Sequence, residues 1–85
     1  MRKSALNDPS LASETLGAKI RRLRSEVGIG QERLAIESHV DQSGLSKFER
    51  GKDNRAISEA AIRRIAAALN ISFENLIDGT DYPLR

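Results

Sequence analysis

Residues Gln31 to Gly51 read QERLAIESHVDQSGLSKFERG and predict two short helices, residues 31–38 and 42–50, joined by a tight turn. The inward-facing residues of this pair are apolar, and they are Leu34, Ala35, Val40, Leu45 and Phe48. His39 falls at the turn, where φ is often positive, and His tolerates this conformation better than most residues. Asp41 follows as the N-cap of the second helix, because its carboxylate can accept hydrogen bonds from first-turn amides.

Another helix is predicted before this pair. Its apolar residues recur at helical spacing, at Leu16, Ile20, Leu23 and Val27. The helix starts either at Asp8-Pro9, an N-cap followed by proline, or later, at Ser13 or Thr15. It ends at Gly28, because glycine readily closes a helix. Gly17 inside the helix costs up to about 1 kcal/mol relative to Ala, so we expect it to allow close packing.

Two more helices are predicted after the pair. Ser58 caps a fourth helix that ends at Asn70. The apolar face of this helix consists of Ala61, Ile62, Ile65, Ala66 and Leu69. Ser72 caps a short fifth helix, residues 73–77. Because all the connections are short, we predict an all-α fold, a compact bundle of five helices.

The length of 85 residues suits one domain. We place this domain at residues 14–79, between a flexible leader, residues 1–13, and a tail, residues 80–85. Arg2 and Lys3 in the leader either contact a polyanionic partner as a basic arm or have no function.

The composition excludes several classes of function. Cysteine is absent and histidine occurs once, so we expect no disulfide and no zinc site. We also expect no cofactor and no small-molecule ligand. There is no nucleophile–base pair, glycine-rich phosphate loop or carboxylate cluster, so an enzyme is not expected. No apolar run reaches the length of a membrane span, and the N-terminus lacks a signal peptide, which predicts a cytoplasmic protein.

The charge distribution is more informative than the net charge of +2. Residues 1–69 carry thirteen basic and nine acidic residues, whereas residues 70–85 carry one basic and three acidic residues. Two basic clusters are evident, Lys19, Arg21, Arg22 and Arg24 in the first helix, and Lys47, Arg50, Lys52 and Arg55 around the third. A basic face beside an acidic tail favours a polyanionic partner, although ordinary solvated charge is the alternative.

The order of these residues resembles the phage-repressor-like helix-turn-helix family, the Cro and lambda repressor (XRE) type. The matching residues are Gln31, Leu34-Ala35, Val40, Leu45 and Phe48–Gly51, with Leu16-Gly17, Ile20–Arg24, Ile65–Ser72 and Leu76. The resemblance covers about residues 16–79. The sequence departs from the family pattern at three places. Gly30 stands where Ser or Thr is usual, His39 replaces a common turn Gly, and the loop of residues 51–58 is slightly long. The resemblance implies the lambda-repressor-like DNA-binding fold.

The third helix is expected to read bases in the major groove of DNA, which admits one α-helix. Its outward residues, opposite the apolar ones, are Gln42, Ser43, Ser46 and Lys47. Gln42 can pair bidentately with adenine, and Lys47 can donate to guanine. Gly44 either allows the helix to approach the DNA backbone closely or is merely small.

Phosphate contacts are expected around the same helix. The candidates are Gln31, Arg50, Lys52, Asn54 and Arg55, although a solvated turn is the alternative for the loop residues. The resemblance implies that Arg24 and Glu49 form a structural ion pair. A plain phosphate contact is the competing role for Arg24.

We therefore expect a sequence-specific regulator of transcription, a repressor or controller that binds double-stranded DNA as a homodimer on a palindromic operator, an inverted repeat. The expected dimer interface comprises Phe73, Ile77, Tyr82 and Leu84. Alternatively, Phe73, Leu76 and Ile77 close the core of the monomer. The alternative function is that of an antitoxin-like or other protein-binding helical module.

Overall fold

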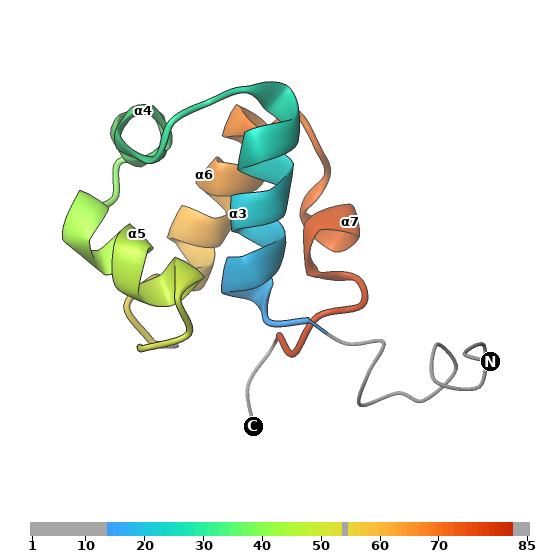
Figure 1. Cartoon of the computed structure of the whole chain (residues 1–85). Helices are drawn as coiled ribbons and strands as arrows, with labels where there is room; N and C mark the ends of the chain where they lie inside the picture. Colours follow the sequence, from blue (N-terminus) through green and yellow to red (C-terminus); the bar gives the residue numbers. More distant parts are fainter. Residues whose placement is uncertain (1–13, 54, 83–85) are drawn as a thin grey trace, which may run out of the picture.

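The structure, a computed structural model, describes residues 14–53 and 55–82, and this part of the chain folds into five helices (Figure 1). In chain order they are α3 (Leu16–Val27), α4 (Gln31–Glu37), α5 (Gln42–Glu49), α6 (Glu59–Ala68) and α7 (Phe73–Ile77). The predicted all-α bundle is confirmed. The predicted second and third helices each end one residue earlier than expected, because Ser38 and Arg50 are their C-caps. Helix starts at Asp8-Pro9 or Ser13 lie outside the described residues.

Helix α3 lies at the centre of the arrangement, with α4 and α5 on one side of it and α7 on the other (Figure 1). It packs on α5 and α7, while α6 packs on α4 and α7. Every helix contributes fully buried side chains, among them Leu16, Ile20, Leu34, Leu45, Ile62, Ile65 and Leu76. Burial of each such side chain contributes about 1.5–3 kcal/mol, so an aliphatic core holds the five short helices together.

The helix ends follow local sequence rules. The N-cap side chains accept hydrogen bonds from first-turn amides at four helices, and these caps are Thr15, Asp41, Ser58 and Ser72. Gly30 caps α4 without a side-chain hydrogen bond. Gly28 ends α3 in the left-handed conformation, as predicted, and His39 follows α4 with φ of 56°. The tight turn between α4 and α5 is therefore confirmed.

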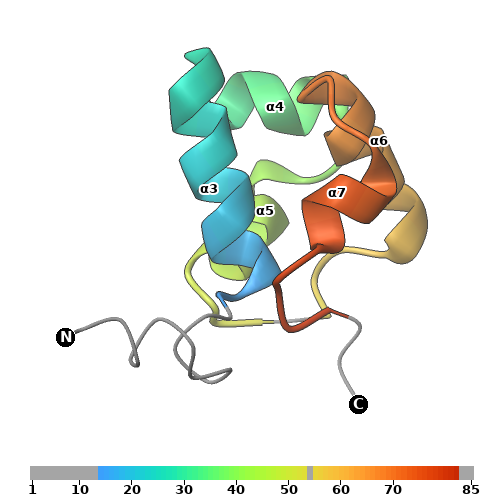
Figure 2. The ribbon, with the colours of Figure 1, turned by 90° about the vertical axis from the view of Figure 1, so that its right-hand side faces the viewer.

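The segment after α7 is attached to the start of α3. Glu14 and Thr80 form an isolated parallel bridge, and the backbone N–H of Leu16 donates to Asp81 Oδ1 at 2.9 Å. Residues 80–82, expected to belong to a tail, therefore join the two ends of the bundle. In Figure 2 the segment that follows α7 runs back to the base of α3.

Two apolar residues of the helices face solvent. Val27 was expected on the inward face of the first helix, but it is 57% exposed. This residue lies in the last turn of α3 and lines an open pocket, which leaves its side chain accessible to solvent. Ile36, on α4, is 66% exposed. No helix formed by residues 14–53 and 55–82 is long and apolar enough to span a membrane.

Candidate nucleic-acid interface

The outward face of α5 carries the four predicted base-contacting residues. Leu45 and Phe48 are buried, which turns Gln42, Ser43 and Lys47 toward solvent. Ser46 is half-buried, because it lies beside α3 and lines a cavity there. The face is therefore short, polar and accessible, except that Ser46 lies closer to the contact between α3 and α5 than expected.

A buried ion pair ties α5 to α3. The Nε and Nη2 atoms of Arg24 each donate to a carboxylate oxygen of Glu49 at 2.9 Å, which makes the pair bidentate. Only 2% of the Glu49 side chain is exposed. The hydrogen bonds to Glu49 raise the pKa of Arg24 above its ordinary value. The ion pair implied by the family resemblance is thus present.

A chain of amides extends this pair to the first turn of α5. The side-chain amide of Gln31, at the start of α4, donates to Glu49 Oε1 at 3.1 Å. Gln42 Nε2 in turn donates to Gln31 Oε1 at 3.4 Å. Gln42 uses one of its two amide hydrogens here, so its second N–H and its carbonyl oxygen can still contact a base. Sequence reasoning missed this connection, because no helical or strand period relates residues 31 and 42.

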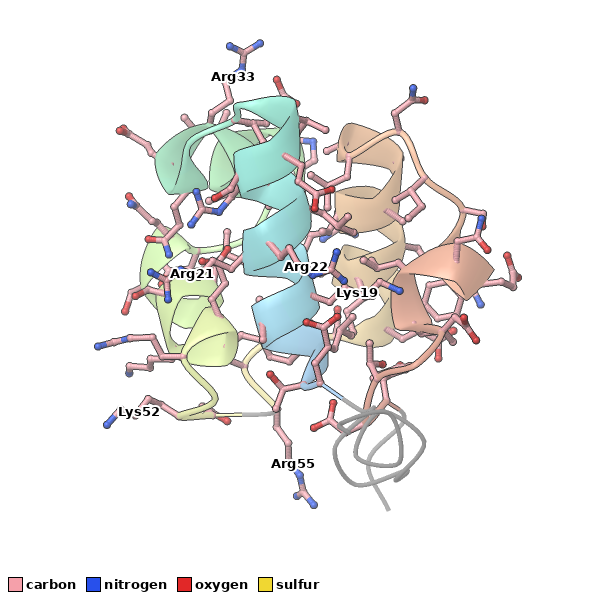
Figure 3. The ribbon with its side chains drawn as sticks, turned by 45° about the vertical axis from the view of Figure 1, so that its right-hand side comes forward. Lys19, Arg21, Arg22, Arg33, Lys52 and Arg55 are labelled. Carbon is pink, nitrogen blue, oxygen red and sulfur yellow. The ribbon has the colours of Figure 1, made fainter. Side chains whose placement is uncertain are left out.

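The predicted basic cluster of α3 is divided among different neighbours. Lys19 Nζ donates to the backbone carbonyls at the end of α7, and Arg22 pairs with Glu14 at 2.6 Å. The hydrogen bond to Glu14 raises the pKa of Arg22. In Figure 3 Arg21 lies on the same side of α3 as α5 and Lys52, whereas Lys19 points toward α7. Arg21 is thus the member of the cluster that extends the α5 face.

A cavity of about 180 Å³ lies between Arg21 and α5. Its lining is rich in guanidinium groups and consists of Arg21, Arg24, Gln31, Ser46, Glu49 and Arg50. Three positive charges and one negative charge meet there, so the cavity favours an anion. No group of three or more His, Cys, Asp or Glu residues suited to a metal ion occurs within the described ranges.

The comparisons with known proteins agree with this geometry. A family model described as a helix-turn-helix domain matches residues 15–78. The HTH-type transcriptional repressor RghR of Bacillus subtilis is 36% identical over 70 residues, 81% of this chain and 50% of RghR. The chain belongs to the XRE-type helix-turn-helix family. It spans half the length of RghR.

Solved structures of XRE-type regulators have the same fold. The biofilm master regulator SinR of Bacillus subtilis, solved in complex with DNA, has a TM-score of 0.69 at 30% identity. The match covers 75% of this chain and all of that SinR chain. The restriction-modification controller protein C.AhdI of Aeromonas hydrophila has a TM-score of 0.65 at 38% identity, over 72% and 89% of the two chains. These proteins are transcriptional regulators and not enzymes.

The loop after the helix-turn-helix motif carries exposed basic side chains. Lys52 and Arg55 point away from the XRE-type domain at one end (Figure 3). Arg50 is exposed, and its Nε donates to Ser46 O at 3.3 Å. Asp53 lies between these residues and accepts from the backbone N–H of Arg55. Asn54, also expected to contact phosphate, falls outside the described residues.

Two of the residues expected at a dimer interface, Phe73 and Tyr82, form a small aromatic cluster on this XRE-type domain. The rings of Phe73 and Tyr82 meet edge to face, with centroids 6.1 Å apart, and the Arg63 guanidinium lies 4.0 Å from the Phe73 centroid. Phe73, Ile77 and Tyr82 are each half-buried against the core. Burial raises the pKa of Tyr82. Leu84 falls outside the described residues.

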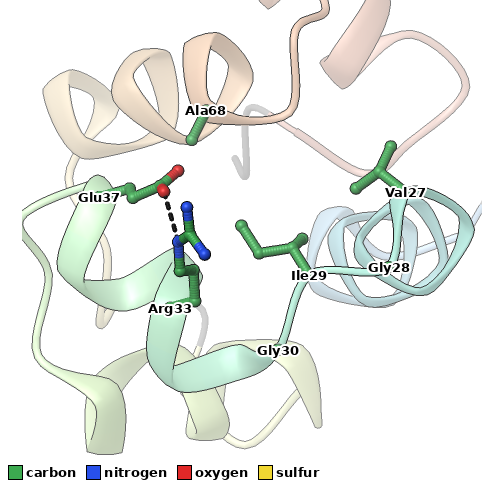
Figure 4. Close-up of a pocket in the computed structure, with 7 residues that line it drawn as sticks. All are labelled: Val27, Gly28, Ile29, Gly30, Arg33, Glu37 and Ala68. Atoms are coloured by element: carbon green, nitrogen blue, oxygen red, sulfur yellow. Dashed lines mark hydrogen bonds and ion pairs between the residues drawn. The ribbon is translucent and has the colours of Figure 1, made fainter.

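A larger pocket, of about 350 Å³, lies away from the α5 face (Figure 4). Its walls come from the end of α3, from α4 and from the end of α6, with Val27, Ile29 and Ala68 as its apolar residues. Arg33 and Glu37 pair across its α4 side at 2.7 Å. In Figure 3 Arg33 lies at the opposite end of the molecule from Lys52 and Arg55.

Proposed function

We propose that this chain is a cytoplasmic, sequence-specific regulator of transcription that binds double-stranded DNA as a homodimer on a palindromic operator. The observation that carries the proposal is the hydrogen-bonded chain from Arg24 through Glu49 and Gln31 to Gln42. It holds the first turn of α5 in a fixed orientation while the outward side of that helix stays polar and exposed. A helix used for base readout needs both properties.

The base contacts are assigned to the exposed end of α5. Gln42 keeps a donor and an acceptor and can pair bidentately with adenine N6 and N7. Lys47 lies about 1.4 turns further along the helix and can donate to guanine O6 or N7. Ser43 and Ser46 are small enough to let the helix enter the groove and can bond either base type.

The phosphate contacts are assigned to residues that flank α5 on both sides. Lys52, Asn54 and Arg55 are the candidates in the loop, and the cavity beside α3 supplies Arg21 and Arg50. Gln31 borders the same cavity from the start of α4. Each basic side chain that neutralises a phosphate releases a counterion, so binding should weaken steeply with salt.

The dimer is assigned to the aromatic cluster at α7. Phe73, Ile77 and Tyr82 are only half-buried in the monomer, so a second copy can cover the remaining apolar surface. Leu84 is a further candidate. One reading helix contacts a few base pairs, and two copies related by a twofold axis double the site that is read.

The proposal is tested with the purified chain. Fluorescence anisotropy should first measure binding to the DNA upstream of its own gene and to a random duplex, each at several salt concentrations. We expect a large preference for the upstream DNA over the random duplex, and footprinting on the upstream DNA should show a protected region with twofold symmetry. Equal affinity for both duplexes, or binding that does not respond to salt, would exclude sequence-specific DNA recognition by α5.

A further inference from the structure

Arg64 on α6 binds the turn between α4 and α5. Its Nε donates to the backbone carbonyl of Ser38 at 2.7 Å, and its Nη2 donates to the carbonyl of His39 at 3.4 Å. Ser38 is fully buried and closes α4, where the last carbonyls of a helix lack intrahelical partners. A cation is also favoured there by the helix dipole. Figure 2 shows the α4–α5 connection running beside α6.

The turn that Arg64 binds contains an unfavourable backbone conformation. His39 has φ of 56°, in the left-handed region that favours glycine and disfavours a residue with a β-carbon. Only the backbone of this residue bonds to its surroundings in the described structure, through its N–H to Ile36 O and through its carbonyl to Arg64. The imidazole is exposed.

The end of α6 provides an internal comparison. Asn70 follows that helix with φ of 61°, and Ile71 N–H bonds to Ala66 O at 3.0 Å. Val40 N–H makes the equivalent bond to Ala35 O, also at 3.0 Å, after α4. The two helix ends therefore have the same backbone pattern. Asparagine is well suited to this conformation, and the end of α4 has two additional hydrogen bonds from an arginine.

We propose that Arg64 is a positioning residue for α5. Its two hydrogen bonds hold His39 in the left-handed conformation and so fix the direction in which α5 leaves the turn. The turn is only three residues long, from Ser38 to Val40, before the Asp41 cap of α5. A change of φ at residue 39 would therefore rotate α5 directly. The inference rests on the proposed function only where DNA binding is the readout.

The test is a double-mutant cycle between Arg64→Ala and His39→Gly. Arg64→Ala in the parent chain should lower affinity about tenfold for a duplex selected by the parent protein from a random library. In the His39→Gly background the same change should lower affinity less than about threefold, because glycine adopts the positive φ without the clamp. Arg64→Lys retains a donor and should fall between the parent and Arg64→Ala. Equal losses in both backgrounds would overturn the proposal.

Two matched backgrounds serve as controls. His39→Ala removes the imidazole but keeps the β-carbon. In this background Arg64→Ala should therefore still cause the full loss of DNA affinity. Asn70→Gly removes a β-carbon at the other left-handed helix end, and the loss should again remain in full. If His39→Ala diminishes the loss as much as His39→Gly does, the imidazole and not the backbone couples to Arg64, and the proposal is wrong.

Denaturant unfolding without DNA separates this proposal from the proposed function. The coupling between residues 64 and 39 should appear in the unfolding midpoints of the same variants. Coupled midpoints in a chain that binds no DNA would support the clamp while excluding the DNA-binding function. If the changes in unfolding midpoint of the two single variants simply add in the double variant, and the chain binds its selected duplex, only the clamp is excluded. If Arg64→Ala fails to fold, recovery of the fold by added His39→Gly supports the clamp, and failure of both variants overturns it.

Discussion

Gly17 on α3 lies against the backbone of Phe48 on α5, so closely that a β-carbon at residue 17 would be 1.9 Å from the Phe48 carbonyl oxygen. Gly17→Ala improves helix propensity by up to about 1 kcal/mol, but the steric overlap must separate the two helices. We expect the steric term to dominate, with a net loss of about 1–3 kcal/mol or more in the free energy of unfolding. Denaturant unfolding of Gly17→Ala and the parent measures this loss.

Gly44 is the matched control, because it also lies inside a helix. A β-carbon there would come no closer than 3.7 Å to the Ala56 carbonyl oxygen, which is ordinary contact. Gly44→Ala should therefore keep or increase stability. The DNA affinity of Gly44→Ala distinguishes the two interpretations of Gly44. A loss on all duplexes indicates that the helix approaches the DNA backbone closely at this position, and no loss indicates that Gly44 is merely small. A stable Gly17→Ala variant would contradict the packing of α3 on α5.

Glu49→Ala should leave the guanidinium of Arg24 buried without its carboxylate partner. We expect a loss of about 3–5 kcal/mol in the free energy of unfolding, because breaking a buried pair leaves an uncompensated charge. Glu37→Ala removes one partner of an exposed pair with Arg33 and should cost at most about 0.5 kcal/mol. Chemical denaturation of both variants makes the comparison. Similar small losses in the two would show that the buried pair contributes no more than a surface pair.

Gln42→Ala and Lys47→Ala should weaken specific binding by about 1–3 kcal/mol each and relax base preference at one position. Lys47→Ala should keep the melting temperature of the parent, since its side chain is exposed. Gln42→Ala should lower the melting temperature only slightly, because it removes the exposed 3.4 Å hydrogen bond to Gln31. Anisotropy titrations with the selected duplex and its single-base variants measure the effect. Ser25→Ala, an exposed change on α3, is a suitable control. Equal losses on selected and random duplexes would mean that these two residues do not read bases.

Arg21→Ala should weaken binding to all duplexes alike and reduce the salt slope by about 0.9, the value for one phosphate contact. Replacing Lys52 and Arg55 together should reduce the slope by about twice that amount. Arg22→Ala is the matched control, because Arg22 is adjacent in sequence but pairs with Glu14 and Glu26. If the salt slope of Arg21→Ala equals that of the parent, the cavity beside α3 is not part of the DNA interface.

Ile77→Asp with Tyr82→Lys should convert the proposed dimer to a monomer while retaining the helical fold. Both side chains are half-buried, so their replacement places charge on the surface that a second copy would cover. Sedimentation velocity measures the oligomeric state, and circular dichroism checks the fold. A variant that folds and still sediments as a dimer would place the interface elsewhere.

Local rules predicted the helix boundaries well, because capping depends on residues a few positions apart. Asp41, Ser58 and Ser72 cap the helices that the sequence assigned to them. Periodicity placed Val27 with the core, since the spacing of apolar residues does not reveal where the neighbouring helix ends. The residue at the end of a helix is therefore the least certain member of its apolar face.

Contacts between residues far apart in the sequence could be identified only from the folded structure. Lys19 and Arg22 looked like members of one basic surface, but acidic and carbonyl groups from the ends of the bundle bind them. The contact between Gln31 and Gln42 likewise depends on the angle between α4 and α5. Family resemblance indicated the Arg24–Glu49 pair, which composition and spacing alone do not identify.

The hydrogen bond from the Leu16 amide to Asp81 has a consequence for biosynthesis. The two residues are 65 positions apart, and the first helix of the described fold gains this cap only when nearly the whole domain is available. During translation the chain emerges N-terminal end first, so α3 leaves the ribosome before Asp81, which accepts the hydrogen bond from its first residue. Limited proteolysis of stalled nascent chains should show protection of α3 rising once residue 81 has left the exit tunnel. This domain would then reach its complete fold only after Asp81 has become available to α3.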